Sequence, residues 1–147
     1  MKRYLGIDLG EKRVGLAISD LTRTIARPFK TIPWVSSSRF ITEIRRIVEE
    51  ESISMVIVGL PITMKGTFSQ KTREVVEVVE ALKRRLPVPV EVYDERLTTV
   101  QAHQTLRELG KKPSRERERV DQIAATHLLQ NYLDREKSRN HRESRSE

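Results

Sequence analysis

Apolar residues alternate with small or polar ones in two short segments near the start of the chain, residues 4–9 and 13–19, which a Gly-Glu-Lys turn connects. Alternation with a period of two is typical of β-strands. A third extended segment, residues 24–34, contains two prolines, which suit an edge strand because proline cannot donate to a hydrogen-bond ladder. The first third of the chain therefore predicts an antiparallel meander of three strands, with the third strand at the edge.

The pattern then changes to helices alternating with strands. Three serines at 36–38 offer N-cap hydroxyls for a helix that ends near residue 51. Apolar residues at intervals of three and four predict further helices over residues 75–82, 98–109 and 114–133. A continuous apolar run at 55–58, closed by Gly-Leu-Pro, is typical of a strand buried on both faces, and we expect it at the centre of the sheet. Alternating valines predict a last strand over residues 87–93.

These elements describe an α/β fold with a five-stranded mixed sheet, in which the antiparallel meander joins two parallel strands and helices cover both faces. A length of 147 residues suits one domain, which we expect over residues 1–133. No large apolar residue follows position 133, so residues 134–147 predict a charged, flexible tail or a frayed helix end. Sheets of this kind bind ligands at the carboxyl ends of their parallel strands.

Composition narrows the classes of function. The chain has 28 Lys and Arg against 21 Asp and Glu, a net charge of +7, which favours a polyanionic partner such as nucleic acid. A dense mixture of charges is also typical of a soluble, heat-adapted surface, and composition leaves that alternative open. The absence of cysteine excludes disulfides, cysteine-ligated metals and thiol nucleophiles. Without an apolar run that could cross a membrane or a signal peptide, we expect a cytoplasmic protein with no membrane partner.

Two acidic positions stand at the expected strand ends. Asp8 lies within an otherwise apolar strand, where an unpaired carboxylate is costly to bury. Alternatively, it caps the turn at Gly10. Asp94 and Glu95 end the last strand and point to opposite faces, so only one of them can face Asp8. We favour Glu95 and keep Asp94 in reserve; the other acid can pair with Arg96 or complement a helix dipole.

A third acid, Asp121, precedes apolar residues at helical spacing and so lies on the helix face that packs against the sheet. The alternative is a first-turn aspartate that complements the helix dipole. Three clustered carboxylates repel one another unless a divalent cation lies between them, and oxygen ligands suit Mg²⁺ or Mn²⁺. Two such ions can activate water and stabilise the leaving oxygen of an in-line attack on phosphate. Asp8, Glu95 and Asp121 are thus candidate metal ligands and candidate catalytic residues.

Basic residues near these acids are candidates for phosphate contact. The densest group precedes Asp121, where interspersed glutamates leave open a self-paired, solvated helix face. Others lie in loops near the expected strand ends. The candidate nucleic-acid-binding residues are Lys12, Arg13, Lys65, Arg96, Lys111, Lys112, Arg115, Arg117 and Arg119.

Four short motifs follow one another along the chain: GIDLGEKRVGLAISD at 6–20, VGLP at 58–61 with Met64 and Gly66 after it, DERLTT at 94–99, and VDQIAA at 120–125. Together they resemble the YqgF family, also called RuvX, whose members are described as Holliday junction resolvases or pre-16S rRNA nucleases. The resemblance spans residues 2–133 in the right order.

The resemblance implies a ribonuclease H-like fold and a hydrolase: a nuclease that uses a divalent metal, Mg²⁺ or Mn²⁺, on structured nucleic acid. By motif position, Asp8, Glu95 and Asp121 are its acidic residues. Many ribonuclease H-like nucleases carry an acid at the end of the fourth strand, where this chain has Gly-Leu-Pro. Glu95 then takes over that role from the neighbouring strand.

The resemblance implies that the substrate is precursor 16S rRNA, which the protein would process at its 5′ end during ribosome biogenesis. The small ribosomal subunit is then a candidate partner. One alternative is a Holliday junction resolvase in DNA recombination and repair. Another is a non-catalytic nucleic-acid-binding factor in ribosome maturation. The Asp-Leu-Gly motif also resembles the phosphate loop of actin-like and sugar-kinase ATPases, but those proteins need two such domains. The sequence leaves monomer and homodimer open.

Overall fold

The computed structural model of the chain describes residues 2–62, 66–97 and 114–145. Five strands form one mixed sheet in the order β3-β2-β1-β4-β5. Strand β2 (Arg13–Ser19) runs antiparallel to both of its neighbours, β1 (Arg3–Leu9) and β3 (Ala26–Pro33). Strands β4 (Ile53–Leu60) and β5 (Val90–Asp94) run parallel to β1. The predicted meander, its proline-containing edge strand and the parallel half of the sheet are confirmed.

One prediction about the sheet is wrong. The central strand is β1, whereas β4 lies between β1 and β5. The apolar run of β4 reports burial on both faces, which any interior strand of a covered sheet shares. It carries no information on how many strands lie to each side.

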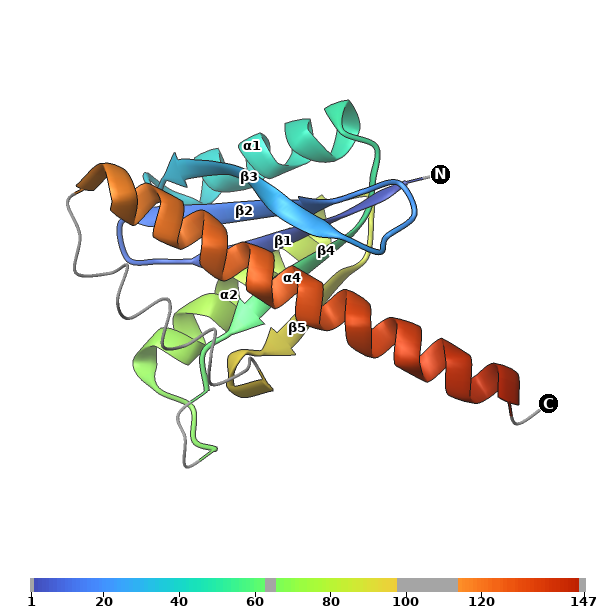
Figure 1. Cartoon of the computed structure of the whole chain (residues 1–147). Coiled ribbons are helices and arrows are strands. Elements are labelled where there is room, and N and C mark those ends of the chain that lie inside the picture. Colours follow the sequence, from blue (N-terminus) through green and yellow to red (C-terminus); the bar gives the residue numbers. More distant parts are fainter. Residues whose placement is uncertain (1, 63–65, 98–113, 146–147) are drawn as a thin grey trace.

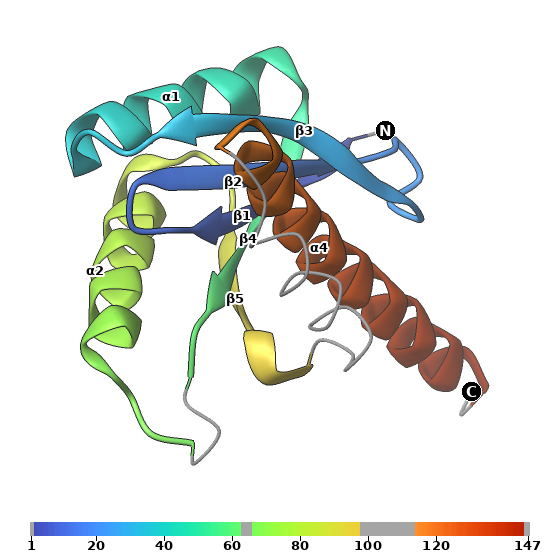
Figure 2. The same cartoon turned by 60° about the vertical axis from the view of Figure 1, so that its left-hand side comes forward.

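Helices cover both faces of the sheet (Figures 1 and 2). On one face lie α1 (Ser37–Glu50) and α2 (Gln70–Arg85), which begin at the N-caps Ser36 and Ser69. On the other face lies α4 (Ser114–Arg145), which crosses the sheet obliquely. A single 3₁₀ turn, η1 (Glu95–Leu97), follows β5. The helix predicted over residues 98–109 lies outside the described residues.

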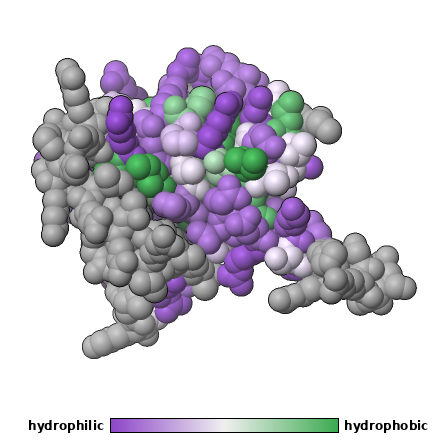
Figure 3. Space-filling view, viewed as in Figure 1, coloured by the Kyte–Doolittle hydropathy of each residue, from purple (hydrophilic) through white to green (hydrophobic). Residues whose placement is uncertain are grey.

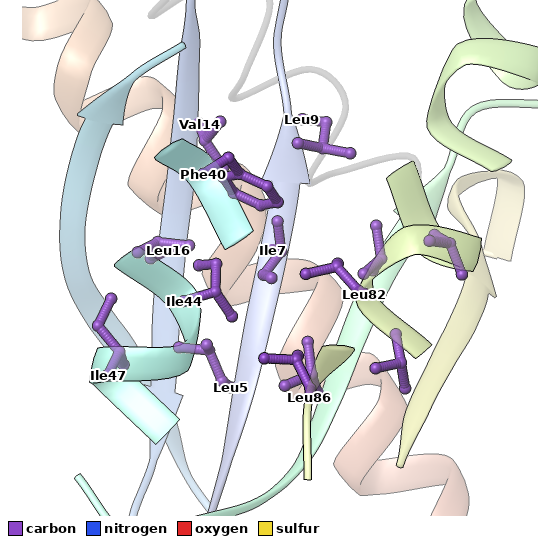
Figure 4. Packing of buried hydrophobic residues seen from close by; sticks show 14 of the residues in the cluster. Leu5, Ile7, Leu9, Val14, Leu16, Phe40, Ile44, Ile47, Leu82 and Leu86 are labelled. Atoms are coloured by element: carbon purple, nitrogen blue, oxygen red, sulfur yellow. The ribbon is translucent and has the colours of Figure 1, made fainter. Parts of the chain in front are cut away.

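Alternate residues of the strands supply two separate cores. Under α1 and α2, aliphatic side chains of β1 and β2 interlock with side chains of both helices, as Figure 4 shows for Leu5, Ile7, Leu16, Ile44 and Leu82. Under α4, the core is smaller and contains tyrosines: Tyr4, Ala17, Ile57, Tyr93, Ala125, Leu128, Leu129 and Leu133. The second core matters for the site because α4 carries Asp121.

The last helix continues to Arg145, beyond the end that the apolar pattern predicts. Two contacts made after Leu133 join it to the sheet: the Tyr4 hydroxyl donates to Glu136 (3.2 Å), and the Arg135 guanidinium lies over the Tyr93 ring (6.0 Å). Because these contacts are made by polar residues, the sequence after Leu133 shows no apolar periodicity. The apolar pattern therefore predicted a helix that ends too early. The division into a domain over residues 1–133 and a flexible tail over 134–147 stays a prediction.

On the face shown in Figure 3, the described residues are mainly hydrophilic, and the hydrophobic ones form small separate patches. Within the described ranges, no helix combines the length and the apolar composition that crossing a membrane requires.

Candidate active site

Asp8 and Glu95 form a hydrogen-bonded pair of carboxyl groups at one end of the sheet. Asp8 lies near the end of β1, opposite Gly15 of β2 in the strand register. Glu95 is the first residue after β5. Because β1 and β5 run in the same direction, their carboxyl ends lie at the same end of the sheet. Helix α4 covers the sheet face opposite α1 and α2. A ligand site at this edge is what the sequence predicts.

Burial changes the acidity of both groups. Desolvation raises the pKa of Asp8, and the nearby charge of Asp121 raises it further. Burial, together with the charge of Asp8 and the hydrogen bond to it, raises the pKa of Glu95 to about 8. The two carboxyl groups therefore share a proton at neutral pH. Two buried carboxyls in contact require a proton or a cation between them.

The space for Glu95 comes from a glycine in the neighbouring strand. A Cβ atom at Gly59 in β4 would lie 2.6 Å from Oε1 of Glu95 and 3.1 Å from Cδ2 of Leu128. Neither distance leaves room for a side chain, so Glu95 occupies the place beside the end of β4. This geometry explains how a chain with Gly-Leu-Pro at that strand end can still have a carboxylate there.

The two consecutive acids after β5 have different partners. Asp94 accepts hydrogen bonds from the Arg96 backbone N–H (2.9 Å) and from Nη2 of Arg96 (2.7 Å). This contact lowers the pKa of Asp94. Asp94 is thus the acid that pairs with Arg96, and Glu95 is the one that faces Asp8.

Asp121 lies on α4, and its Oδ2 accepts a 2.8 Å hydrogen bond from Nε of Arg13, the first residue of β2. It is near enough to Asp8 to raise the pKa of that group. Among the described residues, however, no three carboxylate or imidazole side chains gather closely enough to hold a metal ion. The structure thus joins Asp8 to Glu95 and holds Asp121 close by in an ion pair.

Lys71 is a neighbour of the acids that the sequence analysis missed. Its charge lowers the pKa of both Asp8 and Glu95. It lines a cavity of about 560 Å³ together with Gly10 and Glu11 of the β1–β2 turn. Lys71 lies in the first turn of α2, where the helix dipole disfavours a cation. That unfavourable placement is the sequence signal that could have revealed it.

The candidate phosphate-binding residues are only partly described. Lys12 is exposed beside the acids, and it lines a cavity of about 350 Å³ with Arg13 and Asp121. Arg119 is exposed on α4. Arg96 is exposed but paired with Asp94. The remaining candidates, Lys65, Lys111, Lys112 and the side chains of Arg115 and Arg117, lie outside the described residues.

The donor set suits a hard divalent cation. Asp8 and Glu95 offer only oxygen ligands and no soft donor, which is the chemistry of Mg²⁺ and Mn²⁺ sites. A bound cation would replace the proton between the two buried groups and remove their repulsion.

Comparison with known proteins finds relatives that cover nearly the whole chain. The family model described as "RuvX: Holliday junction resolvase" matches residues 2–135. A protein of Chloroflexus aggregans named "Putative pre-16S rRNA nuclease" is 48% identical over 130 residues, which cover 88% of this chain and 92% of that protein. A Thermoanaerobacter pseudethanolicus protein of the same name is 41% identical over 138 residues, covering 93% of this chain and 99% of that protein.

Solved structures show the same fold at low sequence identity. Thermus thermophilus RuvC in complex with a Holliday junction substrate has a TM-score of 0.59 and 14% identity, covering 91% of this chain and 96% of RuvC. The Fowlpox virus resolvase in complex with Holliday junction DNA has a TM-score of 0.51 and 14% identity, covering 90% and 97%. The predicted ribonuclease H-like α/β fold is thereby confirmed. On the match of nearly its whole length and on these relatives, the chain belongs to the RuvX family.

Proposed function

We propose that this protein is a nuclease that hydrolyses phosphodiester bonds of structured nucleic acid with Mg²⁺ or Mn²⁺ held by Asp8, Glu95 and Asp121. The observation that carries the proposal is the partly buried, hydrogen-bonded pair of Asp8 and Glu95 at the carboxyl ends of parallel strands. A fold does not by itself imply an activity, whereas a pair of buried carboxyls that requires a proton or cation does indicate chemistry.

Each residue has a distinct role in this proposal. Asp8 and Glu95 form the preformed part of the metal site, and Asp121 approaches from α4. A bound divalent cation supplies the activation of water and the stabilisation of the leaving oxygen. Lys12, Arg13 and Lys71 bring positive charge to the phosphate, which lowers its repulsion by the acids.

We propose precursor 16S rRNA, trimmed at its 5′ end, as the substrate, with the small ribosomal subunit as the partner and the cytoplasm as the place. The names of the relatives support this choice. Similarity to a RuvC structure solved with a Holliday junction favours the second candidate, junction resolution. Symmetric cutting of a junction calls for a two-fold dimer, whereas trimming one RNA end requires only a monomer.

The test is cleavage of labelled precursor rRNA that bears its 5′ leader and of labelled four-way DNA junctions, with Mg²⁺, Mn²⁺ or a chelator. We expect metal-dependent cutting of the rRNA, and a loss of at least about 100-fold in Asp8→Asn. Asp94→Asn is the matched control, because Asp94 contacts Arg96 instead of the buried pair. Cleavage by Asp8→Asn at the parental rate would exclude the mechanism. Binding of either substrate without cleavage would favour the non-catalytic factor.

A further inference from the structure

We propose that Arg13 is a positioning residue that withholds Asp121 from the metal site until a phosphate of the substrate takes its place. Nucleic acid and divalent metal would then each strengthen the binding of the other. This inference rests on the proposed function and adds a coupling between the two ligands.

The ion pair lies where both ligands must arrive. Nε of Arg13 and Oδ2 of Asp121 are 2.8 Å apart, and the two side chains are 31% and 23% exposed. Both line the same cavity as the exposed Lys12 and the Gly10 turn. Both side chains of the pair are therefore partly exposed, and a phosphate can reach the guanidinium from the solvent.

Tight packing confines the change to the side chains. A Cβ atom at Gly15 would lie 2.0 Å from the backbone oxygen of Asp121, so α4 already touches β2 at this point. The next residue, Gln122, donates from Nε2 to the Thr31 hydroxyl of β3 (3.1 Å). Since the backbone of α4 is held against two strands, an approach of Asp121 to Asp8 and Glu95 has to come from rotation of its side chain.

Electrostatics makes the exchange most favourable when both ligands are present. Without substrate, moving Asp121 from Arg13 to the buried pair would add a third charge to two repelling carboxyls. Without metal, a phosphate that captured Arg13 would leave Asp121 unpaired. A guanidinium binds phosphate as well as it binds carboxylate, so the exchange keeps Arg13 paired. By linkage, the gain in metal affinity caused by the nucleic acid equals the gain in nucleic-acid affinity caused by the metal.

The experiment measures two binding equilibria that do not require cleavage. Mn²⁺ binding to the protein alone is measured by titration calorimetry, and binding of a labelled four-way junction is measured in chelator. In Arg13→Gln, we expect Mn²⁺ to bind about 3- to 10-fold more tightly and the junction to bind about 3- to 10-fold more weakly, in line with coupling energies of 1–3 kcal/mol. In Arg13→Lys, which keeps a cation for Asp121, Mn²⁺ affinity should return toward the parental value.

Lys12→Gln is the matched control, because it removes the same charge at the adjacent, exposed position. We expect it to weaken junction binding and to leave Mn²⁺ affinity unchanged. Equal Mn²⁺ affinity in Arg13→Gln and Lys12→Gln would overturn the inference, even if the parent cleaves nucleic acid. If the parent neither binds Mn²⁺ nor cleaves, the proposed function itself falls.

Discussion

Glu95 is the residue whose chemistry depends most on its surroundings. A glutamate carboxyl on a surface is ionised at neutral pH, but burial beside Asp8 raises the pKa of Glu95 to about 8. The unfolded chain keeps the ordinary value near 4.5. Between these two values the folded protein binds more protons than the unfolded chain, so raising the pH destabilises the folded state in that window.

The first prediction follows from this sign. In chelator, the free energy of unfolding should fall by on the order of 1 kcal/mol or more as the pH rises from 5 to 8. Glu95→Gln should lack most of this fall, because its amide does not ionise, and it should lose nuclease activity. Urea denaturation at pH 5, 6.5 and 8 measures the effect. An equal fall in parent and variant would show that Glu95 is ionised in the folded state.

A matched control separates the buried pair from other acids on the same strand end. Asp94→Asn removes a neighbouring carboxyl whose pKa is lowered by Arg96. Its fall in stability between pH 5 and 8 should therefore resemble that of the parent. Divalent metal should reduce the fall in the parent, since a cation bound only by the folded state stabilises that state.

At the scale of elements, the contact between α4 and the sheet depends on glycines in the strands. A Cβ atom at Gly15 would lie 2.0 Å from the backbone oxygen of Asp121, whereas one at Gly59 would meet Oε1 of Glu95 at 2.6 Å. A backbone atom of a packed helix cannot yield as the end of a side chain can. An added methyl group should therefore reduce the stability of the protein more at Gly15 than at Gly59.

The second prediction is a ranking of two alanine variants. Gly15→Ala should destabilise the protein by about 3 kcal/mol or more, and Gly59→Ala by about 1–3 kcal/mol, because overpacking costs grow where the neighbour cannot move. Gly59→Ala should still lower activity strongly, since it displaces Glu95. Thermal unfolding and cleavage assays measure both. A stable, fully active Gly59→Ala would contradict the placement of Glu95.

The third prediction concerns the length of α4. A chain that ends at residue 133 loses the Glu136 contact with the Tyr4 hydroxyl and the Arg135 contact with the Tyr93 ring. We expect it to be about 1–2 kcal/mol less stable than a chain that ends at residue 140, as a charged hydrogen bond and an exposed cation–π contact imply. Urea denaturation of the two truncated chains measures the difference. Equal stabilities would favour the flexible tail over residues 134–147 that the sequence predicts.

At the scale of the whole molecule, the chain has a net charge of +7, whereas its candidate active site consists of acidic residues. Among the described residues, cations near the acids come from separate elements: Lys12 from the β1–β2 turn, Arg13 from β2 and Lys71 from α2. Nucleic-acid phosphates that contact such residues release counterions, so affinity should fall with salt.

The fourth prediction is that affinity for a DNA junction in chelator falls at least about 10-fold between 50 and 200 mM salt. Lys71→Gln should reduce the slope of log affinity against log salt by about one. Lys83→Gln is the matched control, because Lys83 lies in the last turn of the same helix and pairs with Glu80. An unchanged slope in Lys71→Gln would remove Lys71 from the phosphate contacts.

Sequence periodicity was sufficient to predict the antiparallel meander and the parallel half of the sheet. The reason is that alternation and helical spacing depend on local geometry and on which faces are buried. It also indicated that only one of Asp94 and Glu95 can face Asp8, since consecutive strand residues point to opposite faces, but it kept Asp94 in reserve. The position of β4 in the sheet was wrong for a related reason: burial is local, whereas strand order depends on pairing between distant segments.

The site itself required tertiary structure. The sequence determined that Asp8, Glu95 and Asp121 belong to elements that meet, because strand ends and the packing face of a helix follow from local pattern. Only the folded chain decided that Asp8 and Glu95 share a hydrogen bond, that Lys71 lies beside them, and that Arg13 holds Asp121. The physical reason is that pKa values and ion pairs depend on distances of a few ångströms between residues far apart in sequence, which no local pattern records.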